Sequence, residues 1–379
     1  MKQYKWNSEM VFDDIKKIKQ IYAENNNIQA LADLRKVSIM LKNSNCFDKP
    51  KRTSYLSDIV DNAIKLYSMD NINVKNENSK DLCNKLEEIK KDNNNNIKIA
   101  NNIKNHKLKR RKYIKVEKVN FSQAINWSKS TFLNFDLKYH CDFNNFIDNG
   151  RIYISDNTEE NKHTCVIPLY TINRVFSQIN FRKNLFSIDD FLFCFLNSQV
   201  CKNKINIKSS KFSKTLEIFF YLIYSDLLKE NNYKAHYDIK YNIYDNFKSR
   251  LNEFKYITNS SNNLVYNSNN SKFVINRDSS LYDGEMVAMF KRGVSYNRIN
   301  SSFVNTYSHL LAIYLYQQYN IDKNKTKNDI KLLIENIGIL PDDQLLKLLN
   351  IDLNILAQCN YLDDFVNKCK YEYTKIKRK

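Results

Sequence analysis

The sequence Phe191-Leu192-Phe193-Cys194-Phe195 leads into a polar segment around Cys201-Lys202-Asn203-Lys204 and then into the alternating apolar residues Ile205, Ile207, Leu216 and Ile218. Aromatic and β-branched residues on both sides of a short polar segment are typical of two paired strands. We therefore predict a β-hairpin over residues 191–218. Its second half carries the lysine-rich run Lys208-Ser209-Ser210-Lys211-Phe212-Ser213-Lys214.

Strands are expected before this hairpin, and helices on both sides of it. The aromatic and β-branched segments 152–154 and 166–170 predict strands. Apolar residues recur at helical spacing over 10–21, 56–67 and 307–319. With 4 Gly and 3 Pro in 379 residues, the chain favours long helices with few tight turns. The sequence predicts a mainly α protein of the α+β class with a small antiparallel β-sheet.

The charge of the chain points to a polyanionic partner. It holds 60 Lys and Arg against 41 Asp and Glu, a formal net charge of +19. An excess of this size over the whole chain is typical of nucleic-acid binding. A solvated, lysine-rich surface is the alternative, because Lys, Asn and Ile accumulate in proteins of AT-rich genomes.

A polar and basic stretch separates the helical first quarter from the rest. Residues 92–96 read Asp-Asn-Asn-Asn-Asn, and residues 104–118 hold eight basic side chains against one acidic side chain, Glu117. Such a stretch has little apolar surface to bury, so we expect a linker at 92–119 between a helical domain at 1–91 and a second domain at 120–379. Its basic side chains are candidates for phosphate contacts, and a solvated loop is the alternative. The four we select are Lys109, Arg110, Arg111 and Lys112.

The eight cysteines are scattered, with no Cys-x-x-Cys pair and no histidine at zinc-ligand spacing. We expect reduced thiols, no metal site and no cofactor. The segment Met1-Lys2-Gln3-Tyr4-Lys5-Trp6 lacks the apolar core of a signal peptide, and no stretch approaches the length of a membrane span. These features predict a soluble, intracellular protein without a membrane partner.

Four short patches are spread over most of the chain: Thr53-Ser54-Tyr55; residues 79–88, Ser-Lys-Asp-Leu-Cys-Asn-Lys-Leu-Glu-Glu; Ile179-Asn180-Phe181-Arg182 with residues 185–191; and Leu348-Leu349-Asn350 followed by Tyr361-Leu362. In these patches the chain resembles the very late expression factors of baculoviruses, a divergent branch of the tyrosine recombinase (integrase) family. The resemblance implies a two-domain, C-shaped clamp, with double-stranded DNA as partner and a homo-oligomer on DNA. It also implies a location in the host nucleus or the virion.

The chemistry of this family needs a tyrosine nucleophile, arginines that stabilise charge on the phosphate, and a proton donor for the departing oxygen. The resemblance places the nucleophile at Tyr361 and the donor, a hairpin lysine, at Lys211. Lys208 and Lys214 are its neighbours and further candidates for DNA contacts. A core or surface tyrosine and a solvated turn lysine are the alternatives.

The sequence departs from the family at the remaining catalytic positions. Gln178 and Ile179 stand where the first arginine is expected, and Asn305-Thr306-Tyr307-Ser308 stands in place of a His-x-x-Arg motif. Arg182 and His309 are the nearest candidates to replace them. Loss of one preorganised donor typically slows a reaction by about 10²–10³. The sequence therefore keeps the scaffold of the family better than its catalytic groups.

Three functions remain open on this sequence. The first choice is a catalytically degenerate recombinase fold that binds viral DNA in genome processing, packaging or late expression. The second is an active strand-transfer enzyme, with arginines supplied by Arg182, Arg292 or Arg298. The third is an unrelated basic RNA-binding protein or ribonuclease, in which His309 or His163 acts as the general base.

Overall fold

The structure is a computed structural model that describes residues 4–69, 102–103, 107–111, 117–155, 163–202, 210–259, 264–267, 272–275, 296–352, 356 and 358–378. The chain divides into two compact units. Unit 1 comprises Met1–Val74, Lys115–Ser209 and Asp329–Pro341, and unit 2 comprises Lys75–Ile114, Ser210–Asn328 and Asp342–Lys379. None of the helices in the described ranges is long and apolar enough to cross a membrane.

In its described residues, unit 1 combines helices with a small sheet. Its helices are α1 (Ser8–Asn25), α2 (Ile28–Leu41), α3 (Pro50–Met69), α6 (Phe121–Phe135), α7 (Leu137–Asp148) and α8 (Ile188–Lys202), with short 3-10 turns at Ser44–Cys46, Tyr170–Ile172 and Leu185–Ser187. Its strands are β1 (Ile152–Ser155), β2 (Cys165–Leu169) and β3 (Arg174–Asn180). Strands β1 and β2 lie where the sequence predicts them.

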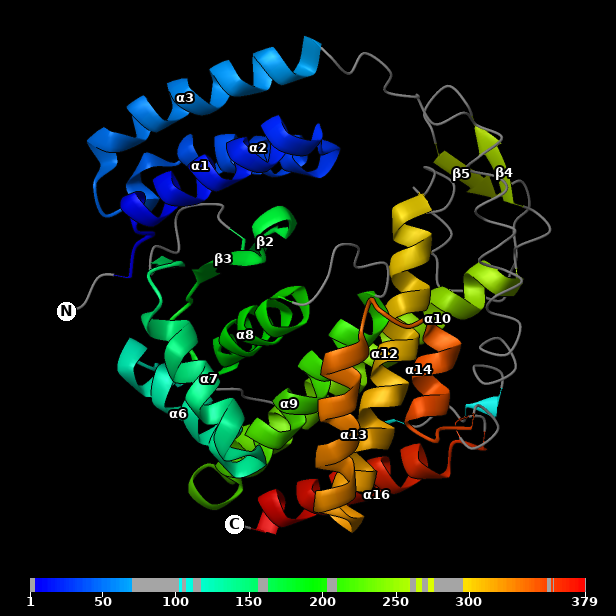
Figure 1. The fold of residues 1–379 in the computed structure, drawn as a ribbon. Coiled ribbons are helices and arrows are strands. Elements are labelled where there is room, and N and C mark those ends of the chain that lie inside the picture. The colour runs from blue at the N-terminus through cyan, green and yellow to red at the C-terminus, as the bar shows by residue number, and fades with distance from the viewer. Residues whose placement is uncertain are drawn as a thin grey trace. The chain divides into compact units, whose positions relative to one another are not determined.

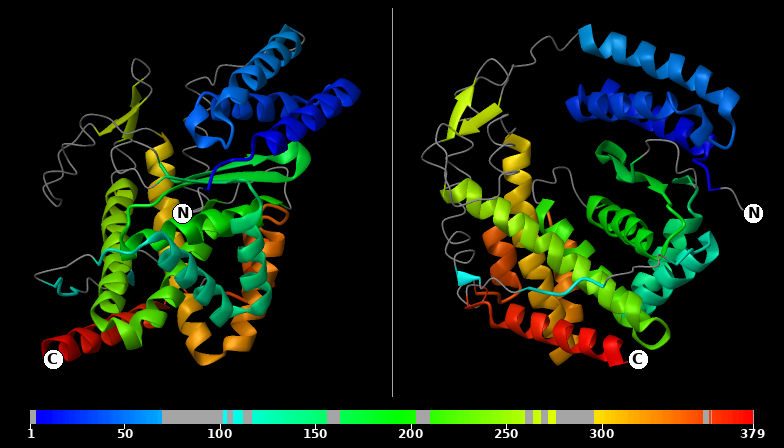
Figure 2. Two further views of the ribbon diagram at one scale, coloured as in Figure 1. Left: turned by 90° about the vertical axis from the view of Figure 1, so that its left-hand side faces the viewer. Right: turned by 180° about the vertical axis from the view of Figure 1, so that it is seen from behind.

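The sheet of unit 1 has the order β1-β3-β2, with β1 parallel and β2 antiparallel to the central β3. The prediction of an antiparallel sheet is therefore wrong for these three strands, which form a mixed sheet. Helices α1 to α3 cover one face of the sheet and α8 lies on the other (Figure 2). The ring of Phe195 on α8 then packs against Phe132 of α6 and Phe143 of α7, with ring centroids 4.5 and 5.3 Å apart.

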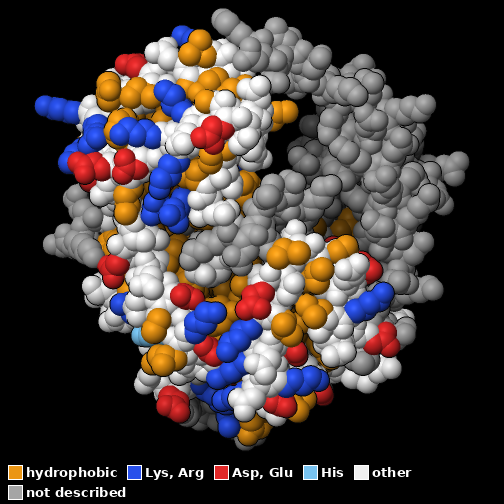
Figure 3. All heavy atoms as spheres, in the orientation of Figure 1, with side chains coloured by type: hydrophobic (Ala, Val, Ile, Leu, Met, Phe, Trp, Pro, Cys, Tyr) orange, Lys and Arg blue, Asp and Glu red, His pale blue; other side chains and the backbone are white. Residues whose placement is uncertain are grey.

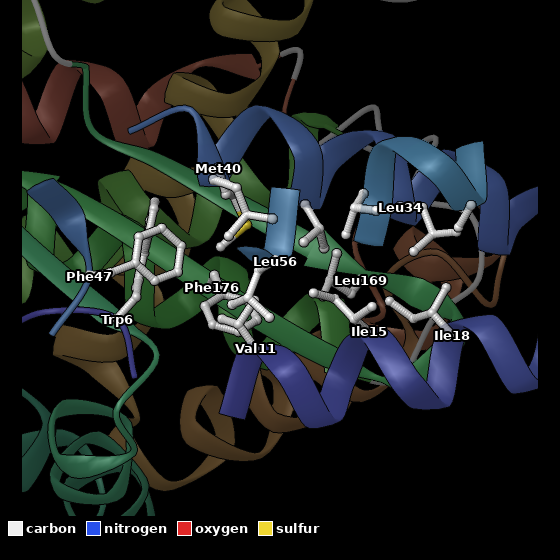
Figure 4. Close-up of a cluster of buried hydrophobic side chains, with 14 of the residues drawn as sticks. Trp6, Val11, Ile15, Ile18, Leu34, Met40, Phe47, Leu56, Leu169 and Phe176 are labelled. Atoms are coloured by element: carbon white, nitrogen blue, oxygen red, sulfur yellow. The ribbon is translucent and has the colours of Figure 1, made fainter. Parts of the chain in front are cut away.

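The N-terminal helices share one hydrophobic core with the sheet (Figure 4). Trp6 is buried there against Phe176 of β3, and its indole Nε1 donates a hydrogen bond to the carbonyl oxygen of Ser177 at 3.0 Å. Asp33 of α2 is fully buried and accepts hydrogen bonds from the backbone N–H and the hydroxyl of Thr171, at 2.8 and 2.7 Å. A buried carboxylate must be paired in this way, so α2 has a fixed partner beside β2.

This shared core differs from the predicted division of the chain. We expected residues 1–91 to form a domain of their own, yet the helices before residue 70 complete their core with side chains from β1 to β3. Most of the predicted linker at 92–119 lies outside the described residues, as does the patch at 79–88.

Unit 2 is built around a group of long helices. Its elements are α9 (Ser210–Asn231), α10 (Tyr233–Asn259), β4 (Leu264–Asn267), β5 (Lys272–Ile275), α12 (Tyr296–Ile321), α14 (Asp342–Leu348) and α16 (Asn360–Arg378), and α13 (Lys323–Asn336) runs across the boundary with unit 1. Helices α9, α10 and α12 pack against one another, and α16 packs against α10 and α12 (Figure 1). Strands β4 and β5 form an antiparallel pair.

The predicted hairpin over residues 191–218 is wrong. Residues 188–202 form α8 and residues 210–231 form α9. In α9 the buried side chains Phe212, Leu216, Phe219 and Ile223 recur at the spacing of a helix. Short apolar runs fit a buried strand and a buried helix equally well, and here tertiary packing selects the helix.

Candidate functional site

The helices of unit 2 bury a group of ionisable side chains where they meet. Asp226 comes from α9, His236 and Lys240 from α10, Tyr316 from α12 and Glu372 from α16. We call these five side chains the ion cluster. His236 and Lys240 are four residues apart on one helix, so they lie on the same face of α10.

Glu372 joins α16 to both basic side chains of α10. Its Oε1 atom lies 3.0 Å from Nε2 of His236 and 3.3 Å from Nζ of Lys240. Lys240 also lies 3.5 Å from Oδ1 of Asp226, so its ammonium stands between two carboxylates. On its other side, His236 places Nδ1 2.7 Å from the carbonyl oxygen of Ser225.

Asp226 is the part of the ion cluster that reaches solvent. Its side chain is 35% exposed, whereas those of Lys240 and His236 are 6% and 0% exposed. The hydroxyl of Tyr316 lies 2.8 Å from each oxygen of the Asp226 carboxylate. Solvent or a ligand can therefore reach the cluster at Asp226, while its other charges are enclosed by the helices.

The pairing keeps Glu372 and Lys240 ionised despite their burial. Burial by itself raises the pKa of Glu372, but the hydrogen bond from His236 and the charge of Lys240 hold that pKa below its ordinary value. Burial alone would lower the pKa of Lys240, yet nearby Tyr316, Asp226 and Glu372 raise it overall. Glu372 is therefore a carboxylate and Lys240 an ammonium at neutral pH.

Tyr361, the predicted nucleophile, is a core residue of α16. The side chain is 8% exposed, and its hydroxyl donates a hydrogen bond to the carbonyl oxygen of Leu356 at 3.2 Å. Burial raises the pKa of Tyr361 well above its ordinary value of 10, with smaller effects from Cys359 and Tyr307. A nucleophilic phenol needs the opposite shift.

Lys211, the predicted proton donor, lies in the first turn of α9. Its Nζ atom is 2.6 Å from Oδ2 of Asp342 and 5.2 Å from the ring centroid of Tyr307. The carbonyl oxygen of Lys211 accepts hydrogen bonds from Ser308 and Thr215, at 2.7 and 2.8 Å. The lysine is thus anchored in unit 2. Tyr307, which lies under its ammonium, is also one of the groups that act on Tyr361.

The other two predicted catalytic residues lie in different settings. His309 is buried in α12, where Nδ1 lies 2.6 Å from the carbonyl oxygen of Asn305, and burial lowers its pKa to about 4. Arg182 belongs to unit 1, where its half-exposed guanidinium lies 3.7 Å from Asp190. Arg292 lies outside the described residues, and so does the side chain of Arg298. No contact that joins all the predicted catalytic residues is found among the described residues, and their catalytic roles stay predictions.

The predicted DNA-contacting residues are partly engaged inside the protein. Arg111 donates two hydrogen bonds to the carboxylate of Asp238 on α10. Beside it, the hydroxyl of Tyr237 donates to the carbonyl oxygen of Lys109. Lys214 pairs with Glu217 on α9, the Lys109 and Arg110 side chains are exposed, and Lys112 and Lys208 lie outside the described residues. On the face drawn in Figure 3, basic side chains are interspersed with acidic and apolar ones over the described part.

Sequence reasoning missed the ion cluster. Glu372 lies 136 residues from His236, so no local motif joins them. The available signal was on α10, where His236 and Lys240 interrupt an otherwise apolar face that includes Ile239 and Ile243. Buried charges need partners, so such an interruption indicates a partner on another element. No group of three or more His, Cys, Asp or Glu side chains in the described ranges could hold a metal ion.

Comparison with known proteins gives a fold likeness. No protein-family model matches the chain, and no curated protein matches it. The chain is similar to a crystal structure assigned as an oligoendopeptidase F, with a TM-score of 0.51 at 10% identity, over 67% of this chain and 49% of that chain. It thus spans about half the length of that protein.

Two further structures show weaker likeness. A crystal structure assigned as a peptidase from Chlamydophila abortus has a TM-score of 0.48 to this chain at 12% identity. The match covers 78% of this chain and 56% of the other. A crystal structure assigned as an oligoendopeptidase F from Bacillus anthracis has a TM-score of 0.47 to this chain at 9% identity. The match covers 86% of this chain and 64% of the other. Both scores are below that of the first structure and add no weight to it.

This fold corrects the recombinase predictions. The chain is mainly helical, as predicted, but its likeness is to the helical fold of a peptidase structure, so the resemblance to very late expression factors and the recombinase clamp are wrong. Three further predictions were inferred from that resemblance and are wrong for the same reason. They are the degenerate DNA-binding function, the strand-transfer alternative, and the double-stranded DNA partner with a homo-oligomer on it. Neither the nuclear or virion location nor the RNA-binding alternative has support in the fold.

Proposed function

We propose that this chain binds short peptides and hydrolyses them. The observation that carries the proposal is the fold likeness to an oligoendopeptidase F structure over 67% of this chain. Fold alone does not determine chemistry, so the peptide ligand class and the hydrolysis both rest on analogy with that structure. Peptides are the ligand class that this analogy supports.

Lys211 is the residue that we propose for recognition of a peptide carboxylate. An ammonium has three N–H donors, and Asp342 accepts from one of them. The side chain is 29% exposed, so the remaining donors can reach a ligand. Its backbone is fixed by the hydrogen bonds from Ser308 and Thr215, which lowers the entropic cost of ordering the group on binding.

The first experiment measures cleavage. The purified chain is incubated with a defined mixture of short peptides, and products are identified by mass spectrometry over time, with a heat-inactivated sample as control. New peptide termini in the active sample alone are the expected result. A mixture that stays intact while peptides bind would overturn hydrolysis and leave peptide binding. A mixture that neither binds nor is cleaved would overturn the proposal.

A second experiment tests Lys211. Fluorescence anisotropy compares labelled peptides that have either a free or an amidated C-terminal carboxyl group. We expect Lys211→Met to weaken binding of the free acid and to leave the amide unchanged. Lys347→Met is the matched control, because its side chain is 81% exposed on α14 and pairs only weakly with Asp343, at 4.0 Å. Equal effects of Lys211→Met on both peptides would remove Lys211 from carboxylate recognition.

A further inference from the structure

Both ring nitrogens of His236 face hydrogen-bond acceptors. Nδ1 lies 2.7 Å from the carbonyl oxygen of Ser225 and 3.8 Å from Oδ1 of Asp226, and neither atom can donate a proton. Nε2 lies 3.0 Å from Oε1 of Glu372. A neutral imidazole has one N–H, so it can satisfy one of these two contacts but not both.

Both contacts of His236 can be satisfied only by one additional proton, and this proton lies on the imidazole ring of His236 and not on the carboxylate of Glu372. Oε1 of Glu372 is also 3.3 Å from the Lys240 ammonium, so it lies between two nitrogen atoms that can donate. Two donors on one oxygen stabilise the ionised form of a carboxyl group. With Glu372 ionised, both contacts of His236 require N–H on the ring.

The charges then balance. A doubly protonated His236 and Lys240 supply two positive charges, and Asp226 and Glu372 supply two negative charges. The phenol of Tyr316 within the cluster is neutral, because burial raises its pKa. The groups beside the cluster are neutral for the same reason: burial raises the pKa of Cys369 to about 12, and it raises the pKa of Tyr233 and of Tyr319. A buried cluster with no net charge avoids the desolvation cost of an uncompensated ion.

We propose that His236 is held as an imidazolium in the folded protein and that, with Lys240, it forms a pair of buried cations that fastens α16 to α9 and α10. Glu372 provides the carboxylate on α16, and Asp226 provides the one on α9. Loss of a ring proton leaves the cluster with an excess negative charge and weakens the attachment of α16. This proton-dependent contact stands apart from the proposed peptide function and does not depend on it.

Nuclear magnetic resonance tests the protonation state directly. The chain has 5 histidines, so the protein is labelled with ¹⁵N-histidine, and a His236→Gln sample identifies the His236 signal as the one that disappears. At neutral pH we expect two protonated, pyrrole-like ring nitrogens for His236. A pyridine-like nitrogen on this ring at neutral pH would overturn the proposal.

Glu372→Gln provides a second, independent readout. The Gln amide can donate to Nε2, so the ring no longer needs its second proton, and we expect a pyridine-like Nε2 signal. Amide hydrogen exchange in α16 should become faster by about tenfold or more. Glu230→Gln, at an exposed position of α9, is the matched control and should change neither signal. An imidazolium that persists in Glu372→Gln would show that Glu372 does not hold the proton.

Discussion

The Nε2 atom of His236 lies 3.0 Å from Oε1 of Glu372, although 136 residues separate them in the chain. The contact joins the first turn of α10 to the last turns of α16. Lys240 shares the same carboxylate oxygen, so the position of α16 depends on two cations at once. Substitutions in this cluster therefore test how the helices of unit 2 are held.

Lys240→Met should destabilise unit 2 strongly. The variant leaves Asp226 and Glu372 without the ammonium between them, and removing one partner of a buried ion pair typically costs about 3–5 kcal/mol. Urea unfolding followed by circular dichroism measures the change in the free energy of unfolding. Lys347→Met, on an exposed lysine, should stay within about 0.5 kcal/mol of the parent. If the two variants unfolded at the same urea concentration, Lys240 would not be needed to balance the cluster.

The stability of unit 2 should fall on the acid side because of Glu372. Its pKa is lower in the folded protein than its ordinary value of 4.5, so its contribution is present above pH 4.5 and is lost as pH falls through the folded value. Thermal unfolding measured from pH 7 downwards should show this loss. The Glu372→Gln profile should be flatter in that range, and a profile parallel to that of the parent would contradict the assignment.

Tyr361→Phe should have a small effect on stability. It removes the buried hydrogen bond to the carbonyl oxygen of Leu356, which typically costs about 0.5–1.5 kcal/mol. Peptide cleavage and binding should be unchanged, because the hydroxyl is buried. Tyr371→Phe, with a side chain 61% exposed, serves as the control. A loss of cleavage in Tyr361→Phe with stability intact would instead support a catalytic role for this tyrosine.

Arg111→Met should release residues 107–111 from α10. The two hydrogen bonds to Asp238 are lost, and the carboxylate is left in a mostly buried position. Limited trypsin digestion should then cut after Lys109 or Arg110 earlier than in the parent. Arg110→Met removes an exposed neighbouring charge, so it should leave cutting after Lys109 unchanged. Equal cutting after Lys109 in both variants would show that the Arg111 contact does not hold this segment.

Periodicity in the sequence predicted much of the helical content but not the connections between elements. The apolar spacing over 307–319 correctly indicated the helix that became α12, and the aromatic segments at 152–154 and 166–170 correctly indicated β1 and β2. The segment 191–218 was predicted as a hairpin, because a short apolar run carries no period that separates a buried helix from a buried strand. Only the tertiary packing of this segment decides between a helix and a strand.

The residues of the candidate functional site could not be predicted from the sequence for a different reason. Lys211 and Tyr361 were chosen through a family resemblance, and the structure places both in unit 2 near Tyr307 without an exposed phenol. The ion cluster has no sequence motif, because its members come from four helices. The sequence does place a histidine and a lysine on an apolar helix face, which indicates that they have buried partners. The neighbouring sequence does not show which carboxylates those partners are.

The hydrogen bond from Trp6 to Ser177 spans 171 residues, and it has a consequence for synthesis of the chain on the ribosome. Translation adds about 5–20 residues per second, so the start of α1 emerges on the order of ten to thirty seconds before β3 can complete the core that α1 to α3 share with it. During that interval their apolar faces are open to water and to other nascent chains. Helices α1 to α3 are therefore the part of the protein that we expect chaperones to bind first.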